Sequence, residues 1–413
     1  MQELLFLAHR IPYPPNKGDK IRSFHLLKHL AGKYRVHLAA FVDDKDDWRH
    51  VSRLRQVCGE THFVALHPGL ARLRSVSGFF SGEPLTVPYY RNTGMQAWVD
   101  QLLTTRPVRR VLVFSSAMAQ YMMGRTLPGA RRVIDFVDVD SDKWRQYAQS
   151  KSWPMSAVYR REARRLLDYD RQVAGDFDAS VFVSLEEAEL FKKLAPDAAA
   201  RVSHINNGVD SDYFSPERDY DYPYAEGEKV LVFTGAMDYW ANADAVCWFA
   251  REVFPLVREQ MPEAVFYIVG GRPSVEVQQL ASLPGVHVTG AVPDVRPYLA
   301  HAVAAVAPLR IARGVQNKVL EAMAMAKPVL ATKAAAEGIE GVAGVLVTDE
   351  PAAFAALAAQ VLRGEMGAEI GRAGRACVLQ RYNWTSNLAR LDYLLEGGGA
   401  HGSPDAFPSV VAA

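Results

Sequence analysis

Short apolar runs alternate along the chain with longer segments whose apolar residues recur every three or four positions. The runs have the length of buried strands, and the periodic segments have the spacing of helices that pack on a sheet by one face. The expected strands are residues 3–8, 34–41, 61–66, 111–115, 132–137, 179–183, 202–205, 230–233, 264–269, 286–289, 302–307, 328–331 and 342–347. This alternation predicts an α/β fold with parallel sheets.

The alternation is interrupted once, between about residues 206 and 228, where turn-forming and polar residues predominate. A chain of 413 residues is long enough for two domains of ordinary size. We therefore predict two doubly wound domains, residues 1–210 and 211–383, followed by a terminal helix at 384–396. The last stretch, 397–413, is rich in Gly, Ser, Pro and Ala, so we expect it to be disordered.

Charge is distributed unevenly although the net charge is only +1. Residues 1–210 hold 31 Lys and Arg against 23 Asp and Glu, a charge of +8, and the remainder carries −7. A basic first half suggests an anionic partner such as an inner-membrane surface or a lipid-linked phosphate, although scattered solvated charge gives the same count. Residues 67–91 mix Phe and Tyr with Arg, which is typical either of a segment that dips into a membrane or of an irregular loop.

The three cysteines, Cys58, Cys247 and Cys377, are far apart and odd in number, which argues against a disulfide framework or a metal cluster. The first ten residues include an acidic residue and too short an apolar run for a signal peptide. No run reaches the roughly 20 apolar residues that span a bilayer. We expect a cytoplasmic protein, at most peripheral to a membrane, with no nucleic-acid partner.

Candidate chemistry is concentrated at residues 306–331, where an apolar run, a basic loop with a glycine and a helix beginning near Asn317 follow one another. On a helical wheel, Lys318 and Glu321 share one sector, opposite the side that would pack on a sheet. Open α/β sheets bind ligands where strands end and helices begin, and free helix N–H groups favour phosphate. A carboxylate there suits sugar hydroxyls, so we predict a nucleotide-sugar pocket. Taken alone, the pair would be an intrahelical ion pair worth about 0.2–0.5 kcal/mol.

Glycines follow several predicted strands of the second half: Gly235, Gly270–Gly271 and Gly290. A bare backbone at successive strand ends favours a ligand surface over simple turns. Gly18, after the first strand, fits equally a loop close to a phosphate or sugar and a turn in Lys17–Asp19 that closes onto a helix at 21–31. None of these is a three-glycine dinucleotide fingerprint, so a dehydrogenase is not expected.

Acidic residues gather at 135–142, at the end of the predicted strand 132–137. Asp140 or Ser141 would cap the helix that follows, which leaves Asp138 as the site candidate on the ligand side of the sheet. A divalent-metal site here would need ligands from elsewhere in the chain. We predict no metal.

Four segments carry a resemblance to a known family: residues 9–23, 135–144, 207–210 and 317–324. Over roughly residues 1–396 the chain resembles glycosyltransferase family 4. Within it, the chain is most similar to the sugar transferases of the bacterial PEP-CTERM/exosortase exopolysaccharide system. The resemblance implies a GT-B fold, in which two Rossmann-like domains face each other across a cleft and the terminal helix crosses back to the first domain.

The resemblance also implies residue roles. Glu321 would hold the ribose hydroxyls, Lys318 and Arg310 would face the diphosphate, and Gly235 would lie under the nucleotide. Lys17 and Gly18 would approach the donor from the first domain. Arg313 stands where many members have a glutamate, and Gly235-Ala-Met-Asp replaces a Gly-Arg pair with a nearby lysine. We infer that the loop 310–318 supplies most of the positive charge that faces the leaving diphosphate. The expected catalytic residues are Asp138, Arg313 and Lys318.

The implied activity is retaining transfer of a sugar from a UDP-sugar or GDP-sugar, without metal or further cofactor. The acceptor hydroxyl would belong to a saccharide or a polyprenyl-diphosphate-linked exopolysaccharide precursor. A nucleotide-sugar epimerase on the same architecture and a catalytically silent nucleotide-sugar-binding protein are the alternatives.

Overall fold

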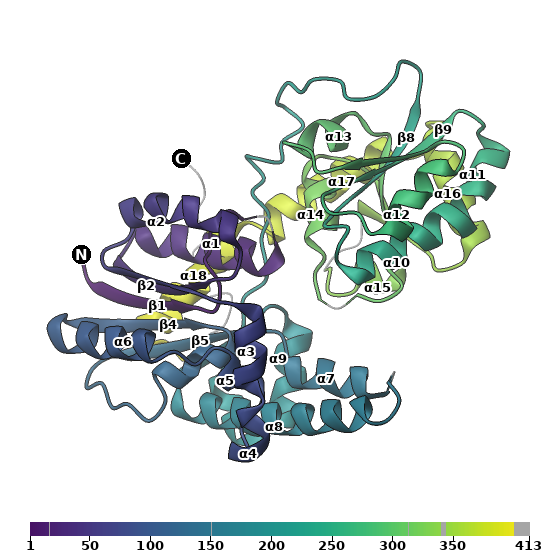
Figure 1. Ribbon diagram of the computed structural model, residues 1–413. Helices are drawn as coiled ribbons and strands as arrows, with labels where there is room; N and C mark the ends of the chain where they lie inside the picture. Colours follow the sequence, from purple (N-terminus) through teal and green to yellow (C-terminus); the bar gives the residue numbers. More distant parts are fainter. Residues whose placement is uncertain (16, 150, 313, 340–343, 400–413) are drawn as a thin grey trace. The chain divides into compact units, whose positions relative to one another are not determined.

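The computed structural model describes residues 1–15, 17–149, 151–312, 314–339 and 344–399. The chain forms two compact units (Figure 1). Unit 1 consists of residues 1–206 together with the chain from Leu388 onward, and unit 2 consists of residues 207–387. Within the described residues, no helix has the length and apolar character needed to cross a membrane.

Unit 1 is built on a parallel sheet of seven strands in the order β3-β2-β1-β4-β5-β6-β7, counted over the described residues. The strands are β1 (Glu3–Ala8), β2 (Arg35–Val42), β3 (Thr61–Ala65), β4 (Val108–Phe114), β5 (Arg131–Val137), β6 (Ala179–Phe182) and β7 (Val202–His204). The helices are α1 (Gly18–Ala31), α2 (Val51–Val57), α3 (Pro68–Ser75), α4 (Ser77–Ser81), α5 (Thr86–Tyr89), α6 (Thr93–Thr105), α7 (Asp140–Gln149), α8 (Met155–Asp176) and α9 (Leu185–Leu194). Five of the six residues of β1 and five of the seven residues of β4 are buried, as expected for central parallel strands covered on both faces.

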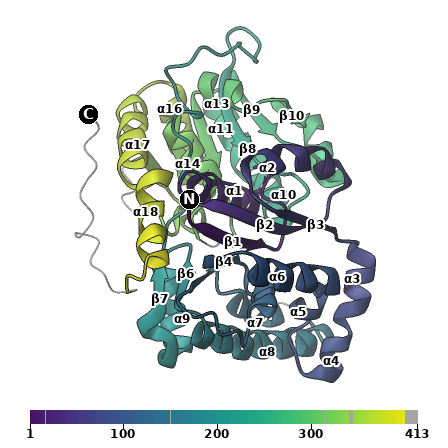
Figure 2. The same ribbon diagram turned by 90° about the vertical axis from the view of Figure 1, so that its left-hand side faces the viewer.

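Unit 2 repeats the same plan with the strand order β10-β9-β8-β11-β12-β13 (Figure 2). Its strands are β8 (Lys229–Thr234), β9 (Ala264–Val269), β10 (Val286–Gly290), β11 (Ala304–Ala307), β12 (Val329–Ala331) and β13 (Val345–Val347). Its helices are α10 (Trp240–Trp248), α11 (Phe254–Gln260), α12 (Val275–Gln279), α13 (Arg296–His301), α14 (Asn317–Ala324), α15 (Lys333–Ala336), α16 (Pro351–Leu362) and α17 (Ala368–Arg381). The predicted class, an α/β fold with two doubly wound parallel sheets, is confirmed.

The last helix, α18 (Trp384–Leu395), begins in unit 2 and ends in unit 1. Asp392 accepts hydrogen bonds from His29 (2.9 Å) and Lys33 (2.5 Å), next to the end of α1. Glu396 accepts one from Tyr34 (2.7 Å). These contacts fix the C-terminal end of α18 to α1 and to the segment before β2.

One local prediction was wrong. Helix α1 begins at Gly18, not Ile21, so Lys17–Asp19 is not a turn: Lys17 is the extended residue before the helix and Gly18 is its first residue. Residues 67–91, for which a membrane-dipping segment and an irregular loop were both considered, form three short helices, and Tyr89 and Tyr90 pack against the core of unit 1.

Both sheets reverse their winding direction beside the first strand. In unit 2 the chain runs β8, β9, β10 to one edge and returns to β11 on the other side of β8. The crevice outside the carboxyl ends of strands at such a switch point is the usual ligand position in open α/β sheets. Gly235 follows β8, and the basic loop follows β11, so both predicted segments lie at this point.

Gly270→Ala is expected to lower the free energy of unfolding by about 3 kcal/mol, because the added Cβ would lie 1.7 Å from the carbonyl oxygen of Gly235. Urea unfolding monitored by circular dichroism measures the change. Gly271→Ala is the control, since its Cβ would meet nothing nearer than 3.5 Å. Equal stability of the two variants would contradict the close packing of these strand ends.

Candidate functional site

Lys318 is the second residue of α14, at the switch point of unit 2. Its Nζ donates a hydrogen bond to Oδ1 of Asn242 (2.5 Å) and lies 4.6 Å from the ring centroid of Phe233. Burial lowers the pKa of Lys318 to about 8, against the nearby carboxylate of Glu321, which favours the charged form. The ammonium group is therefore held over an aromatic face and charged at neutral pH.

Glu321 follows one turn later on α14 and is half-buried. Burial raises the pKa of its carboxyl to about 7, and the charge of Lys318 opposes the rise. The two groups thus have pKa values displaced toward each other by a shared desolvated environment. Perturbed groups of this kind at a strand-end crevice are typical of functional sites.

Asn242, on α10, is the residue that sequence reasoning missed. Its side chain is 5% exposed; Oδ1 accepts from Lys318, and Nδ2 donates to the carbonyl of Ala236 (2.8 Å). A Cβ on Gly235 would lie 2.9 Å from Nδ2, so Gly235 provides the room that the amide occupies. The available signal was an amide on the apolar side of a helix, where Ala245 and Val246 are also buried. Asn242 therefore joins Gly235 to Lys318.

Asn242→Asp is expected to raise the pKa of Lys318, because a carboxylate would replace the neutral acceptor. The pH above which nucleoside diphosphate binding weakens should then move upward, which calorimetric titrations on both sides of pH 8 would measure. Gln260→Glu introduces the same charge on the exposed end of α11 and should leave this pH unchanged. An unshifted profile in Asn242→Asp would show that the hydrogen bond does not set the state of Lys318.

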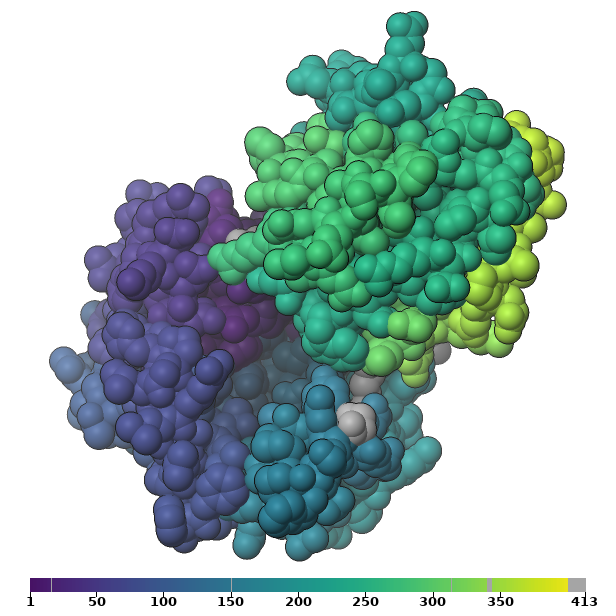
Figure 3. Space-filling view, turned by 45° about the vertical axis from the view of Figure 1, so that its right-hand side comes forward, coloured from purple at the N-terminus to yellow at the C-terminus, as the bar shows by residue number. Residues whose placement is uncertain are grey.

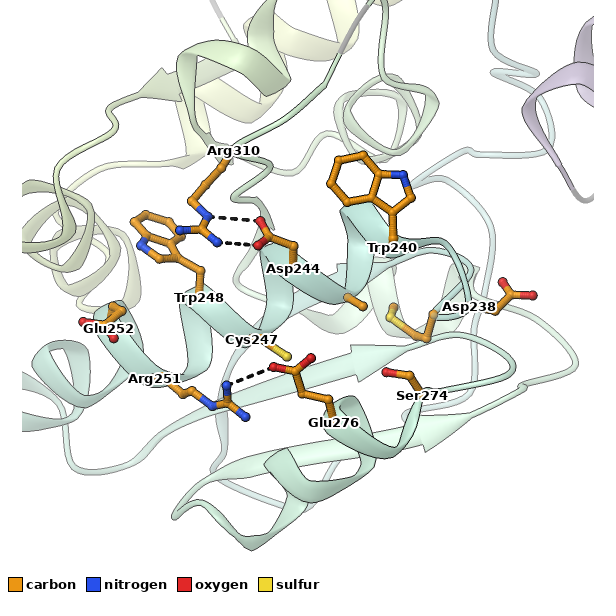
Figure 4. A pocket seen from close by; sticks show the side chains of 12 residues that line it. Asp238, Trp240, Asp244, Cys247, Trp248, Arg251, Glu252, Ser274, Glu276 and Arg310 are labelled. Carbon is orange, nitrogen blue, oxygen red and sulfur yellow. Dashed lines mark hydrogen bonds and ion pairs between the residues drawn. The ribbon is translucent and has the colours of Figure 1, made fainter. Parts of the chain in front are cut away.

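Arg310 lies apart from Lys318. Its side chain is exposed and donates two hydrogen bonds to the carboxylate of Asp244 on α10. It lines a cavity of about 490 Å³ with Met237, Asp238, Trp240, Ala243, Asp244, Cys247, Trp248, Arg251, Glu252, Ser274 and Glu276 (Figure 4). Lys318 and Glu321 do not line this cavity. Its four carboxylates outnumber its two arginines, so a nucleoside diphosphate is unsuited to it.

The unit 1 candidates lie at strand and helix ends. Asp138 directly follows β5 and pairs with Lys143 (2.6 Å), and Val137 beside it has a φ of 71°, an unusual conformation for a β-branched residue. Lys17 and Gly18 are exposed at the start of α1. Arg313 lies outside the described residues.

The acidic residues of segment 135–142 are engaged by basic side chains of unit 1. Its carboxylates pair with cations: Asp135 with Arg22 (2.8 Å), Asp138 and Asp140 with Lys143, and Asp142 with Arg145. In the part of the chain that the structure describes, no group of three or more His, Cys, Asp or Glu side chains is placed to hold a metal ion.

Sequence reasoning also missed a cluster of ion pairs made by the two residues that directly follow β1. His9 Nε2 lies 3.3 Å from Asp19 Oδ2, and Arg10 bridges Asp19 (2.5 Å) and Asp43 (2.9 Å). Burial opposes ionisation of Asp19, but the hydrogen bond from His9 and the charge of Arg10 keep its pKa well below the usual value. The first turn of α1 is thereby fixed against the end of β1.

Solved structures share the architecture over nearly the whole chain. Sucrose-phosphate synthase from Thermosynechococcus elongatus superposes with a TM-score of 0.69 at 15% identity, covering 96% of this chain and 98% of that one. WaaG, a glycosyltransferase involved in lipopolysaccharide biosynthesis, gives 0.66 at 16% identity (96% and 100%). HepE from Anabaena in complex with UDP gives 0.64 at 14% identity (96% and 100%). The fold is that of the GT-B glycosyltransferases.

Sequence comparison adds a family match and a relative to this structural similarity. Residues 228–364, within unit 2, match the family model described as glycosyl transferases group 1. The GDP-mannose-dependent alpha-(1-6)-phosphatidylinositol monomannoside mannosyltransferase of Mycolicibacterium smegmatis is 28% identical over 292 residues, which cover 65% of this chain and 71% of that protein. The chain is therefore similar to the glycosyl transferases of group 1, most clearly within unit 2. The matched range contains Gly235, Asn242, Lys318 and Glu321.

Proposed function

We propose that the protein transfers a glycosyl unit from a UDP-sugar or GDP-sugar to an acceptor hydroxyl, with retention at the anomeric carbon. The observation that carries the proposal is the Lys318–Glu321 pair at the switch point of unit 2, with Asn242 holding the lysine against the Gly235 turn. The cation of Lys318, suited to a diphosphate, and the carboxylate of Glu321, suited to ribose hydroxyls, lie one helical turn apart on α14.

The chemistry follows from where charge develops. Breaking the bond between the sugar and the diphosphate leaves negative charge on the phosphate oxygens, and preorganised donors in a desolvated site lower the barrier. Lys318 supplies a cation, and the N–H groups at the start of α14 supply a favourable dipole. Arg310 and Arg313 would add charge; for Arg310 this requires leaving Asp244. We assign Glu321 to the ribose hydroxyls and propose that the step proceeds without metal.

Unit 1 would contribute Asp138 to catalysis and Lys17 and Gly18 to donor binding. We propose a saccharide or a polyprenyl-diphosphate-linked exopolysaccharide precursor as the acceptor, in a PEP-CTERM/exosortase type of system. The protein would then work in the cytoplasm as a peripheral protein on the inner face of the membrane. The similarity to a GDP-mannose-dependent mannosyltransferase and to HepE, which was solved with UDP, supports a nucleotide-linked donor.

A thermal-shift screen with UDP, GDP and their sugars tests the donor class. A ligand at 100 times its dissociation constant should stabilise the protein by about 2.7 kcal/mol. Proton NMR of the nucleotide sugar after incubation then separates the activities, because epimers have equal masses but different coupling constants: transfer or slow donor hydrolysis is expected. An epimer formed without acceptor, or no response to any nucleotide, would refute the proposal.

A further inference from the structure

Helices α3 and α4 of unit 1 carry an exposed apolar ridge. Leu70, Leu73, Val76, Phe79 and Phe80 are 66%, 71%, 46%, 43% and 89% exposed. Four of them recur at helical spacing (70, 73, 76 and 80), so they form one stripe and not scattered positions. Single exposed apolar residues are ordinary, but a contiguous stripe of large ones marks an interaction site. In the space-filling view, this dark blue segment lies at the surface of unit 1 (Figure 3).

The ridge is held firmly against α8. Arg161 of α8 donates hydrogen bonds to the carbonyls of Gly78 (2.5 Å) and Glu83 (3.2 Å), and its guanidinium lies 4.7 Å from the Phe79 ring centroid. The backbone N–H of Leu85 donates to Glu162 (2.9 Å). These contacts order the backbone beneath the ridge while its apolar side chains stay in solvent. The exposure is therefore a property of the fold.

Exposed arginines lie on α3 and on α8, the helix that holds the ridge. Arg72 on α3 and Arg160, Arg164 and Arg165 on α8 are exposed, and none has an ion-pair partner among the residues that the structure describes. The Arg165 guanidinium reaches within 3.9 Å of the Cβ position of Gly82, directly after α4. The nearby acidic groups are occupied: Glu83 pairs with Arg91, and the buried Glu162 accepts from Leu85.

We propose that the ridge and its arginines dock the protein onto an anionic phospholipid bilayer. The apolar side chains would enter the boundary between headgroups and acyl chains, and the arginines would meet lipid phosphates. The charge favours this occupant over a second copy of the chain, because a symmetric contact through the ridge would bring the same arginines together. The inference deepens the proposed function and rests on its membrane-linked acceptor.

The test is flotation of the full chain with phosphatidylcholine vesicles that contain or lack phosphatidylglycerol. The wild-type protein should float with the anionic vesicles, and added salt should weaken its binding. Leu73→Glu with Phe80→Glu, and separately Arg164→Glu with Arg165→Glu, should each weaken binding about tenfold or more. Val57→Glu changes an exposed valine of α2 in the same unit and should bind like wild type.

Nucleotide-induced thermal shifts of the same variants keep the two proposals separate. Ridge variants that lose vesicle binding but keep the nucleotide response support the surface. Wild-type protein that binds nucleotides but ignores anionic vesicles, or ridge variants that bind them unchanged, would overturn the surface alone. A dimer in vesicle-free solution that Phe80→Glu abolishes would also overturn it, in favour of self-association. Vesicle binding without any nucleotide response would refute the transferase and leave the surface standing.

Discussion

Replacing Lys318 with alanine is expected to lower the rate of glycosyl transfer by about 10²–10³-fold, the usual loss for one preorganised donor to a developing negative charge. The change removes the cation that Asn242 and Phe233 hold at the switch point of unit 2. Initial rates with the donor identified by thermal shift measure it. Lys333→Ala is the control, because Lys333 is a largely exposed lysine of the same unit that pairs with Asp349.

The pH dependence gives a second, independent reading of Lys318. Burial lowers its pKa to about 8, so the side chain is charged below this pH and neutral above it. Affinity for a nucleoside diphosphate should therefore fall as pH rises through 8, and binding above that pH should take up a proton. Lys318→Arg keeps its charge and should lose this alkaline fall. A wild-type affinity that stays constant through this range would contradict the assigned role.

Glu321→Ala is expected to weaken nucleotide affinity about 10–150-fold, since a hydrogen bond to a charged group contributes roughly 1.5–3 kcal/mol. Calorimetry with UDP or GDP, whichever binds, measures the loss. Wild type and variant should bind the corresponding 2′-deoxynucleotide with similar affinities. Glu259→Ala removes an exposed carboxylate of α11 in the same unit and should bind normally.

Glu321 should also control the acidic side of the binding profile. Burial raises its pKa to about 7, so the carboxylate is lost as pH falls through 7 and with it part of the capacity to accept ribose hydrogen bonds. Together with Lys318, this predicts an affinity maximum between about pH 7 and pH 8. Glu321→Gln, which does not titrate, should remove the acidic fall and move the alkaline fall to lower pH, because the carboxylate no longer favours charged Lys318. Persistence of the acidic fall in Glu321→Gln would assign it to another group.

The positions of the strands and the placement of Lys318 and Glu321 on one helix could be predicted, because both depend on local pattern. Buried parallel strands are continuous apolar runs, so β1, β4 and β8 were visible in the sequence, and the Lys318–Glu321 spacing fixes a shared helical sector. The beginning of α1 could not be read in this way. Its first turn, which contains Gly18, is stabilised by the contacts of Asp19 with His9 and Arg10, which depend on the folded chain.

Side-chain contacts between residues far apart in the sequence could not be predicted either. Arg310 was expected to face a diphosphate, yet it pairs with Asp244, 66 positions earlier. Asn242 contacts Lys318 across 76 positions. No local period encodes either contact, because each depends on how α10 packs beside the strand ends.

The division of unit 1 along the sequence affects the order in which the protein can be completed during synthesis. Asp392 and Glu396, which contact α1 and the segment before β2 through His29, Lys33 and Tyr34, leave the ribosome after the whole of unit 2. Domains generally fold as units while the chain emerges. Unit 2 is continuous from 207 to 387, so it can reach its final contacts before unit 1 receives its closing helix.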